Sequence, residues 1–519
     1  MNPKSPIIIF VAVLASLLEI VDTSIVNVAL PTMMGNLGAT LEDISMVITG
    51  YAIANAIVLP VSSWVSEKIG RRKYYLGCIS AFTVTSIACG LAPNLETLII
   101  FRIFQGLMGG ALLPTSQALI YEQFPKEKAG MAGAIFGMSV MIGPALGPVL
   151  GGYLTDQFGW RSIFNINLPL GVLAFVVGSM CIFDRVKTEQ EKNESKGFDV
   201  FGLILLVLGI GCLQYVLEQG QSDDWFASTP ILICSILTIV CLPLFIYWEL
   251  KTENPIINVR LFSQRIVVSG VGLMIFLGFF LYAVVFVLPV FLGSSFHYTP
   301  TQTGLLFIPG SILTAMMMPM IGRLMTAGVN PKLLIFIGLT GVEICLLTMT
   351  GYSPQSSRDH ILNSLYLRGF AMAFLFVPIN SSILSQFKGA ALGQVSGLLN
   401  LFRQLGGSSG VALVATLLAK NSSQNFLDLS SHVSLLNPST QVSYYGALNS
   451  FSLKMSSSLG ITSPLTATLK SFYGRIQAQV FMLSFNQLIW TIMILFSLSY
   501  IPLYFLVLKS KTIAPVDAH

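Results

Sequence analysis

Six ionisable side chains lie inside long apolar stretches of this sequence, where no water is available to solvate a charge. They are Glu19, Asp22 and Arg102 in the N-terminal part and Glu343, Arg368 and Arg403 in the C-terminal part. Charges in an apolar environment are costly, and they usually face a partner or a polar cavity. These residues are therefore the first candidates for binding a ligand or for moving charge.

Glu19, Asp22 and Arg102 are predicted to act together. Asp22 and Arg102 each lie about six residues from the outer end of their apolar stretch, so a rise of about 1.5 Å per residue puts them at one depth. Glu19 and Asp22 are three residues apart and share a helix face. Two carboxylates on one apolar face resist double ionisation, so we expect this group to take up and release protons, with Arg102 tuning Asp22. The alternatives are a static ion pair that fixes helix register and, for Glu19, attraction of a cationic ligand.

The C-terminal group is expected to form a second charge network. Glu343 lies at a depth comparable to those of Arg368 and Arg403, so it is placed to neutralise one of them. None of the four histidines falls inside an apolar stretch, which leaves carboxylates to carry protons. The seven cysteines all lie in apolar runs, without the spacing of a disulfide framework or a metal site.

These charges require helices that cross a membrane. Hydrophobic residues make up 54% of the 519 residues and charged residues only 10%, against about 25% in soluble domains. So few charges cannot cover a water-facing surface, and most of the surface must face lipid. Because a spanning helix needs about 20 mostly apolar residues, we predict fourteen spans, at residues 6–29, 44–65, 74–92, 96–120, 130–154, 164–183, 199–217, 230–249, 266–292, 301–324, 332–351, 361–385, 393–419 and 480–508.

The basic residues orient the spans, and two long connections divide the chain. With the N-terminus in the cytoplasm, most lysines and arginines fall in cytoplasmic connections, as membrane proteins prefer. We therefore expect both termini in the cytoplasm. Residues 184–198 form a charged cytoplasmic linker. Residues 420–479 form an outer segment rich in Ser, Asn, Gln and Thr, which we expect to be functional or disordered, with short helices near 444–459 and 465–480.

Two glycine-rich motifs accompany the charges. The connection after the second span contains Glu67, Gly70, Arg71 and Arg72, where glycine allows a tight reversal and the basic pair favours the cytoplasmic face. A weaker echo at residues 322–328 indicates an internal repeat.

In the fifth span, glycines recur every four residues and make a smooth face for close helix packing, with prolines that invite a bend. We expect this motif to gate an interface between bundles, with simple tight packing as the alternative; it comprises Gly143, Pro144, Gly147, Pro148, Gly151 and Gly152.

Together with the end of the first span, residues 21–31 (VDTSIVNVALP), these motifs resemble those of the major facilitator superfamily. The fifth-span motif is similar to that of its fourteen-span drug:proton antiporter branch. Glu67 stands where the family usually has Asp, and Ser63 stands where its loop motif usually begins with Gly. The resemblance implies an all-α membrane fold of two six-helix bundles, residues 1–183 and 266–519, joined by the linker 184–198 and two inserted helices within 199–265.

The resemblance also implies a function. We expect a proton-coupled antiporter that exports diverse hydrophobic or cationic drugs through a cavity between the bundles, across a bacterial inner membrane. Its implied partners are a periplasmic membrane-fusion adaptor, docked on residues 420–479, and an outer-membrane channel. An exporter of an endogenous metabolite, such as a siderophore or fatty acid, is the alternative. The cavity is expected to be aromatic and adaptable, lined by Phe276, Phe280, Tyr282, Phe374 and Asn380.

Other classes of function find no support in the sequence. It shows no catalytic constellation and no phosphate-binding loop of an ATP-driven pump. We therefore expect no enzymatic activity, no cofactor, no metal and no nucleic-acid partner.

Overall fold

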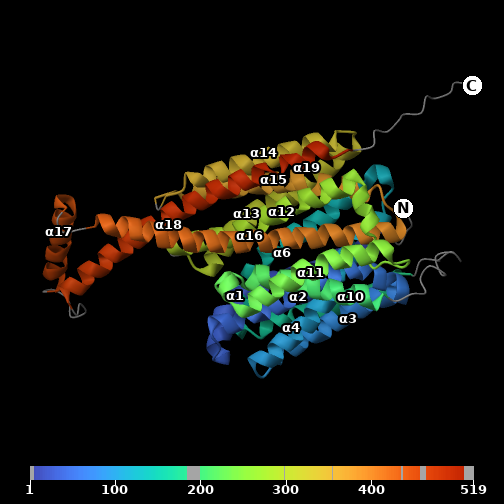
Figure 1. Cartoon of the computed structure of the whole chain (residues 1–519), viewed down its shortest axis with the longest axis horizontal. Coiled ribbons are helices and arrows are strands. Elements are labelled where there is room, and N and C mark those ends of the chain that lie inside the picture. Colours follow the sequence, from blue (N-terminus) through green and yellow to red (C-terminus); the bar gives the residue numbers. More distant parts are fainter. Residues whose placement is uncertain are drawn as a thin grey trace, which may run out of the picture.

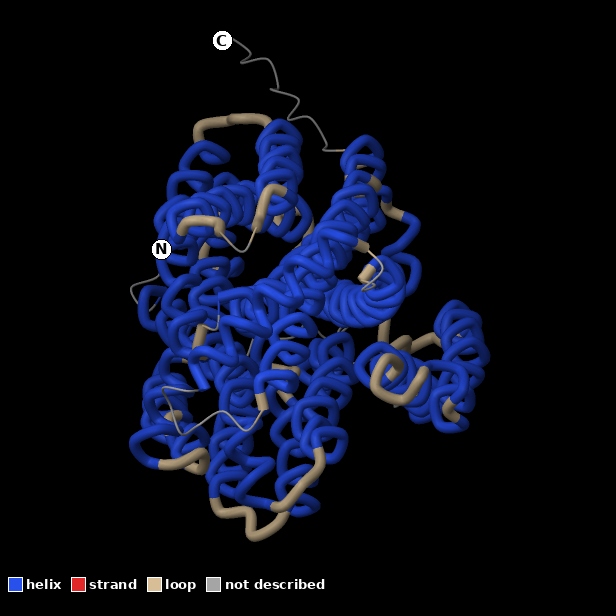
Figure 2. Tube along the Cα trace, turned by 90° about the vertical axis from the view of Figure 1, so that its left-hand side faces the viewer, coloured by secondary structure: helices blue, strands red, loops and turns tan. Residues whose placement is uncertain are grey.

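Long helices lie side by side and make up almost all of the computed structural model (Figure 1). The structure describes residues 5–183, 199–296, 298–353, 355–433, 437–455 and 463–507, and within these ranges it contains helices and no strand (Figure 2). Thirteen helical segments are long and apolar enough to cross a membrane. The remaining predicted span coincides with α3 (Arg71–Gly90), a helix of 20 residues. The expected all-helical membrane fold is therefore confirmed.

The N-terminal bundle begins with three long helices joined by tight turns. Thr40 caps α2 by accepting a hydrogen bond from the backbone of Asp43, and Gly70, with φ of 98°, makes the reversal into α3. The fourth span is divided into two helices, and so is the sixth. In order, the elements are α1 (Ser5–Leu37), α2 (Leu41–Ile69), α3, α4 (Leu95–Gly109), α5 (Leu112–Glu122), η1 (Lys126–Lys128), α6 (Ala129–Phe158), α7 (Ser162–Asn165) and α8 (Asn167–Cys181).

Two inserted helices and the C-terminal bundle follow. The predicted linker, residues 184–198, lies outside the described residues. The inserted pair is α10 (Val200–Gln219) and α11 (Thr229–Lys251). The short helix η2 (Trp225–Ala227) follows α10, and η3 (Val259–Ser263) follows α11. The later helices are α12 (Arg265–Phe296), α13 (Pro300–Thr326), α14 (Pro331–Thr350), α15 (Arg358–Leu384), α16 (Gly389–His432), α17 (Pro438–Met455), α18 (Pro464–Ser497) and α19 (Tyr500–Phe505).

The described parts of the predicted outer segment, residues 420–433, 437–455 and 463–479, are mostly helical. α16 does not stop near residue 419 but continues to His432, and α18 begins at Pro464, well before the predicted span. No Gly or Pro interrupts residues 411–432, so a polar composition alone does not end the helix. Asn425 ties the extension of α16 to α18 by donating to Ser484 and Gln487. In Figure 1 these extensions carry α17 away from the bundle, at the end opposite to the N-terminus.

The two bundles meet along several helix pairs. α6 packs on α13 and α15, α2 packs on α16, and α5 packs on α16, while α10 lies against both α2 and α16. The α6–α13 contact is close because two glycines cross there: a Cβ on Gly130 would stand 2.7 Å from the carbonyl oxygen of Gly322. The side chains of Glu19, Asp22 and Arg102 are buried inside this arrangement of helices.

Candidate functional site

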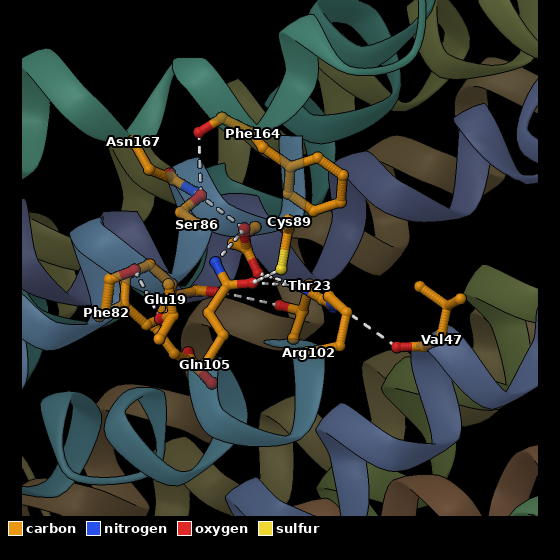
Figure 3. A network of polar contacts seen from close by, with 12 residues as sticks. Glu19, Thr23, Val47, Phe82, Ser86, Cys89, Arg102, Gln105, Phe164 and Asn167 are labelled. Carbon is orange, nitrogen blue, oxygen red and sulfur yellow. Dashed lines mark hydrogen bonds and ion pairs between the residues drawn. The ribbon is translucent and has the colours of Figure 1, made fainter. Parts of the chain in front are cut away.

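A buried ion pair between Asp22 of α1 and Arg102 of α4 forms the centre of the site. Arg102 Nη1 lies 2.6 Å from Asp22 Oδ2, and both side chains are almost fully buried. Their predicted meeting at one depth is therefore confirmed. Figure 3 shows this network, to which α2, α3 and α8 also contribute.

Asp22 accepts hydrogen bonds from two amide side chains as well. Gln105 Nε2 donates to Asp22 Oδ1 at 2.9 Å, and Asn167 Nδ2 donates to the same oxygen at 2.7 Å. Asn167 is held by Ser86, whose hydroxyl accepts from it at 2.9 Å and donates to the carbonyl oxygen of Phe164. All partners of Asp22 are donors, which is the arrangement that suits an ionised, accept-only carboxylate.

Arg102 is immobilised from the other side. Its Nε donates to the carbonyl oxygen of Val47 at 3.3 Å, and Nη1 also donates to Gln105 Oε1 at 2.9 Å. The guanidinium lies over the Tyr51 ring, 4.1 Å from its centroid, a contact that stabilises a cation away from water. The Asp22–Arg102 network thus fastens α1, α2, α3, α4 and α8 to one another.

Glu19 lies one turn away on α1 and is held much less firmly. It accepts a hydrogen bond from Asn55 Nδ2 of α2 at 2.9 Å, and it forms no ion pair within the described part of the chain. It is nevertheless buried, and close enough to Arg403 of α16 to interact with its charge. The two carboxylates on one face of α1 therefore differ: Asp22 is fully engaged, whereas Glu19 can exchange partners.

A chain of amides joins the bundles next to these acids. Gln117 of α5 donates to Asn380 Oδ1 of α15 at 2.7 Å, and its own oxygen accepts from Ser396 and Asn400 of α16. Of the predicted cavity residues, Asn380 is thus the one that crosses to the other bundle. The amide chain continues to Arg403, whose Nη2 donates to Asn400 at 3.3 Å. Polar groups of both bundles therefore form one continuous buried cluster.

The predicted second charge network is wrong. Glu343 accepts a hydrogen bond from Ser497 of α18 at 3.0 Å and forms no ion pair with Arg368 or Arg403 in the ranges that the structure describes. Arg368 instead lies over the ring of Phe307, 5.1 Å from its centroid. Shared depth put these residues at one level, but they lie on helix faces that point to different neighbours.

The glycine face of α6 packs against α1 rather than the opposite bundle. A Cβ on Gly143 would clash with Ile20, one on Gly147 with Ser24, and one on Gly151 would stand 2.8 Å from the carbonyl oxygen of Ile25. The expected interface between bundles is instead made by other residues of the motif. Gly152 faces Thr301 of α13, and Pro148 faces Gly304 of the same helix. The repeated glycines thus fix the distance from α6 to the helix that carries Glu19 and Asp22.

The motif of residues 67–72 holds helix ends together. Arg71 forms an ion pair of 2.6 Å with Glu122 at the end of α5, and Arg72 donates to the carbonyl oxygen of Ser179 in α8 at 2.7 Å. Glu67 lies in the last turn of α2, just before the Gly70 reversal. Ser63, the departure from the family motif, lies against Gly393 of α16, where the missing side chain provides the room.

The predicted aromatic cavity is wrong for most of its residues. Phe280 is fully buried and packs against Phe496 of α18, 5.5 Å between ring centroids, and Phe276 packs against the same ring. Phe374 is buried beside Phe370, 4.4 Å between ring centroids. Tyr282 packs against Gly407 of α16 and stays 40% exposed. Phe276, Phe280 and Phe374 thus pack within the C-terminal bundle, because large apolar side chains pack in their own bundle as readily as they line a cavity.

The sequence reasoning missed the amides that complete the site. Asn55, Gln117, Asn167, Asn380 and Asn400 are all buried inside membrane-spanning helices, and only Asn380 was predicted. A buried amide in an apolar helix is costly unless it is hydrogen-bonded, so each was a detectable signal. Among the described residues, no three His, Cys, Asp or Glu side chains gather in a way that could hold a metal ion.

Comparison with known proteins agrees with this architecture. The sequence profile of the Major Facilitator Superfamily matches residues 12–411. Two solved structures share the fold. The human organic anion transporter MFSD10 aligns with a TM-score of 0.60 and 15% identity over 80% of this chain and 94% of its own. The proton:xylose symporter XylE aligns with a TM-score of 0.57 and 16% identity over 81% of this chain and 90% of its own.

The curated relatives include proteins named as multidrug export proteins. The multidrug export protein EmrB of Haemophilus influenzae is 32% identical over 483 residues, which cover 92% of this chain and 91% of that protein. EmrB of Escherichia coli is 34% identical over 434 residues, 83% of each chain. The fatty acid resistance protein FarB of Neisseria gonorrhoeae is 32% identical over 425 residues, 81% of this chain and 82% of that protein. The chain therefore belongs to the major facilitator superfamily, and along most of its length it is similar to the EmrB multidrug export proteins.

Proposed function

We propose that this protein is a proton-coupled exporter of hydrophobic and cationic drugs in the bacterial inner membrane, with both termini in the cytoplasm. One observation carries the coupling: two buried carboxylates share a face of α1, and only one of them is neutralised by an ion pair. The relatives named as multidrug export proteins support the substrate class. In Figure 1 the last described helix, α19, lies at the end of the bundle opposite α17, which supports placing these two helices on opposite sides of the membrane.

The geometry suggests how a proton acts on the carrier. A proton on Asp22 would replace an acceptor by a donor, and it would remove the charge that holds Arg102, Gln105 and Asn167. The links from α1 to α4 and α8 would then weaken together. Glu19 lies at the bundle boundary, where a cationic drug and a proton compete for one negative charge. Proton entry from the outside would thus release the drug outward, and proton loss to the cytoplasm would reset the carrier.

Transport into proteoliposomes tests this proposal. With tetraphenylphosphonium as the probe, an imposed pH gradient is expected to drive transport by the wild-type protein and not by Asp22→Asn, which keeps the shape of the side chain but cannot titrate. Glu96→Gln, an exposed carboxylate in the first turn of α4, serves as the matched control and is expected to transport like the wild type. Gradient-driven transport by Asp22→Asn at the wild-type rate would refute a coupling role for Asp22. A wild-type protein insensitive to the gradient would refute the proposed function.

A second substrate class rests on the arginines of the C-terminal bundle. Arg368 Nη1 and Arg403 Nε are buried N–H groups without a hydrogen-bond partner in the described structure. A carboxylate is the natural acceptor for a guanidinium, so an acidic amphiphile such as a fatty acid is the alternative cargo. One relative is named as a fatty acid resistance protein. Palmitate in place of tetraphenylphosphonium, in the same proteoliposomes, distinguishes the two classes.

We also propose that α17 and the extensions of α16 and α18 dock a periplasmic adaptor that leads to an outer-membrane channel. These helices expose large apolar side chains, among them Leu427 at 68%, Val442 at 75% and Tyr473 at 55%. Removal of α17, residues 438–455, is expected to abolish co-purification with the adaptor while leaving the membrane bundle folded. Undiminished co-purification would refute docking on α17.

A further inference from the structure

The inserted helix α10 is tied to both bundles at its outer end. Its last two residues face opposite partners. Gln219 Nε2 donates to Thr49 Oγ1 at 2.8 Å and to Ser45 Oγ at 3.1 Å, both on α2 of the N-terminal bundle. Glu218 Oε1 accepts from Ser408 Oγ at 2.6 Å, on α16 of the C-terminal bundle. Any rocking of one bundle on the other must therefore break one of these two sets of bonds.

The tie to α16 is a closed ring of three polar side chains. Gln214 Nε2 donates to Glu218 Oε1 at 2.9 Å and to Ser408 Oγ at 2.7 Å, and the Ser408 hydroxyl donates to the same carboxylate oxygen. Each bond to Glu218 suits an ionised carboxylate, because that group only accepts. Gln214 is fully buried, and its Oε1 has no donor in the described structure. The ring therefore lacks one donor while Glu218 is charged.

The position of Glu218 makes its charge expensive to keep. It is the last residue but one of α10, where the negative end of the helix dipole disfavours an anion. It forms no ion pair within the described ranges. The elements packed around α10 and the turn that follows it contain, toward this end, Glu42 and Asp43 on α2, Asp223 and Asp224 in the turn, and Arg403 and Lys420 on α16, so four of these six charged groups are acidic. Two neutral donors alone therefore hold the Glu218 charge.

We propose that Glu218 is a further proton-binding carboxylate of the transport cycle, apart from the pair on α1, and that its proton controls the attachment of α10 to α16. A proton from the outer side binds a carboxylate oxygen of Glu218, and the new O–H can donate to Gln214 Oε1. The two bonds at Glu218 Oε1 change from charge-assisted bonds to neutral ones, which are roughly half as strong. Gln219 keeps α10 on α2 while the attachment to α16 weakens. This inference rests on the proposed proton-coupled function and assigns a role to the inserted pair.

Trp225, in the turn after α10, reports on the same junction. Its Nε1 donates to Thr416 Oγ1 at 3.1 Å. Thr416 lies on α16, C-terminal to Ser408 on the same helix. When α16 separates from α10, this bond breaks and the indole changes its surroundings. Purified full-length protein in detergent is expected to change its tryptophan emission as the pH is lowered. Trp225→Phe removes this change and so assigns it.

Two single substitutions, each of which neutralises one carboxylate, then test the role of Glu218. Glu218→Gln keeps an oxygen acceptor for Ser408 but cannot titrate, and it is expected to abolish the pH-dependent emission of Trp225. Glu42→Gln, an exposed carboxylate on the same side of the protein, is the matched control and is expected to preserve it. Persistence of the full emission change in Glu218→Gln would overturn the proposal, and so would its absence from the wild-type protein.

Infrared difference spectra across the same titration measure the proton directly. The carbonyl band of protonated carboxylic acids is expected to lose one component in Glu218→Gln, and an unchanged band would overturn the proposal. In proteoliposomes, the rate of tetraphenylphosphonium transport by Glu218→Gln is expected to depend less steeply on outer pH than that of the wild-type protein, because Asp22 still titrates. The emission and infrared readouts need no transport. If the wild-type protein shows both signals but no gradient-driven transport, the proposed function fails while the proton switch at Glu218 stands.

Discussion

The two bundles differ in whether their buried charges have an oppositely charged partner. In the N-terminal bundle, Asp22 and Arg102 neutralise each other, and every strong partner of Asp22 is a donor. In the C-terminal bundle, Arg368 and Arg403 have no acidic partner within hydrogen-bonding range in the described structure, and each keeps a buried N–H without an acceptor. The first arrangement stabilises one packing of five helices. The second leaves N–H groups of Arg368 and Arg403 available to donate to a bound substrate, such as one with a carboxylate.

Breaking the ion pair from one side is expected to have the largest effect. Arg102→Met leaves the Asp22 charge buried without a cation, which costs about 3–5 kcal/mol. The midpoint of thermal unfolding in detergent should fall sharply. The double variant Asp22→Asn with Arg102→Met removes both charges and is expected to recover much of the loss. A single variant as stable as the wild-type protein would mean that the ion pair does not hold the bundle.

The same substitution in the other bundle sharpens the contrast. Arg368→Met removes a cation that has no acidic partner, so no uncompensated charge remains. The loss of its contact with the Phe307 ring is worth about 0.5–2 kcal/mol. We therefore expect a smaller shift of the unfolding midpoint than for Arg102→Met. Equal shifts in the two variants would show that the bundles do not differ in this respect.

Packing between α6 and α1 provides a test of intermediate size. Gly147→Leu places a side chain where Ser24 of α1 already lies, and overpacking costs about 1–3 kcal/mol. Transport of tetraphenylphosphonium should fall well below the wild-type rate while membrane insertion is preserved. Gly77→Leu is the matched control, because a Cβ at Gly77 meets nothing within 4 Å. Near-normal transport by a well-expressed Gly147→Leu protein would contradict a close-packed role for this face.

The two bundles also differ in how far the sequence predicted them. Depth in the membrane follows from residue count, and it was enough to bring Asp22 to Arg102. The direction in which a side chain points around the helix depends on which helices become neighbours, and that depends on tertiary packing. For this reason Glu343 was paired with the wrong residues. The aromatic rings of α12 failed in the same way, since their spacing does not distinguish Phe496 of α18 from an open cavity.

Local signals account for the other differences. Fourteen apolar stretches of sufficient length predicted the spans, because the requirement for about 20 apolar residues leaves few alternatives. The polar extension of α16 was missed because hydropathy marks where lipid ends, whereas a helix continues until a residue breaks it. The buried amides were visible in the sequence, but their partners depend on which helices become neighbours: Asn55 and Asn167 meet the carboxylates of α1, and Gln117 meets Asn380 and Asn400.

Glu343→Gln is expected to have the smallest effect, and it separates a charge network from a local contact. The carboxylate is half-buried and accepts one hydrogen bond, from Ser497 of α18. Glutamine retains a carbonyl oxygen in the same position, so that bond survives and only the charge is lost. A substitution of this kind changes stability by about 0.5 kcal/mol or less. Transport and its dependence on outer pH should match those of the wild-type protein in the proteoliposome assay. The partner variant Ser497→Ala removes the hydrogen bond from the other side and should be equally mild. If Glu343→Gln instead lost gradient-driven transport as Asp22→Asn is expected to, the C-terminal bundle would contain a coupled charge after all, and the contrast between the two bundles would fail.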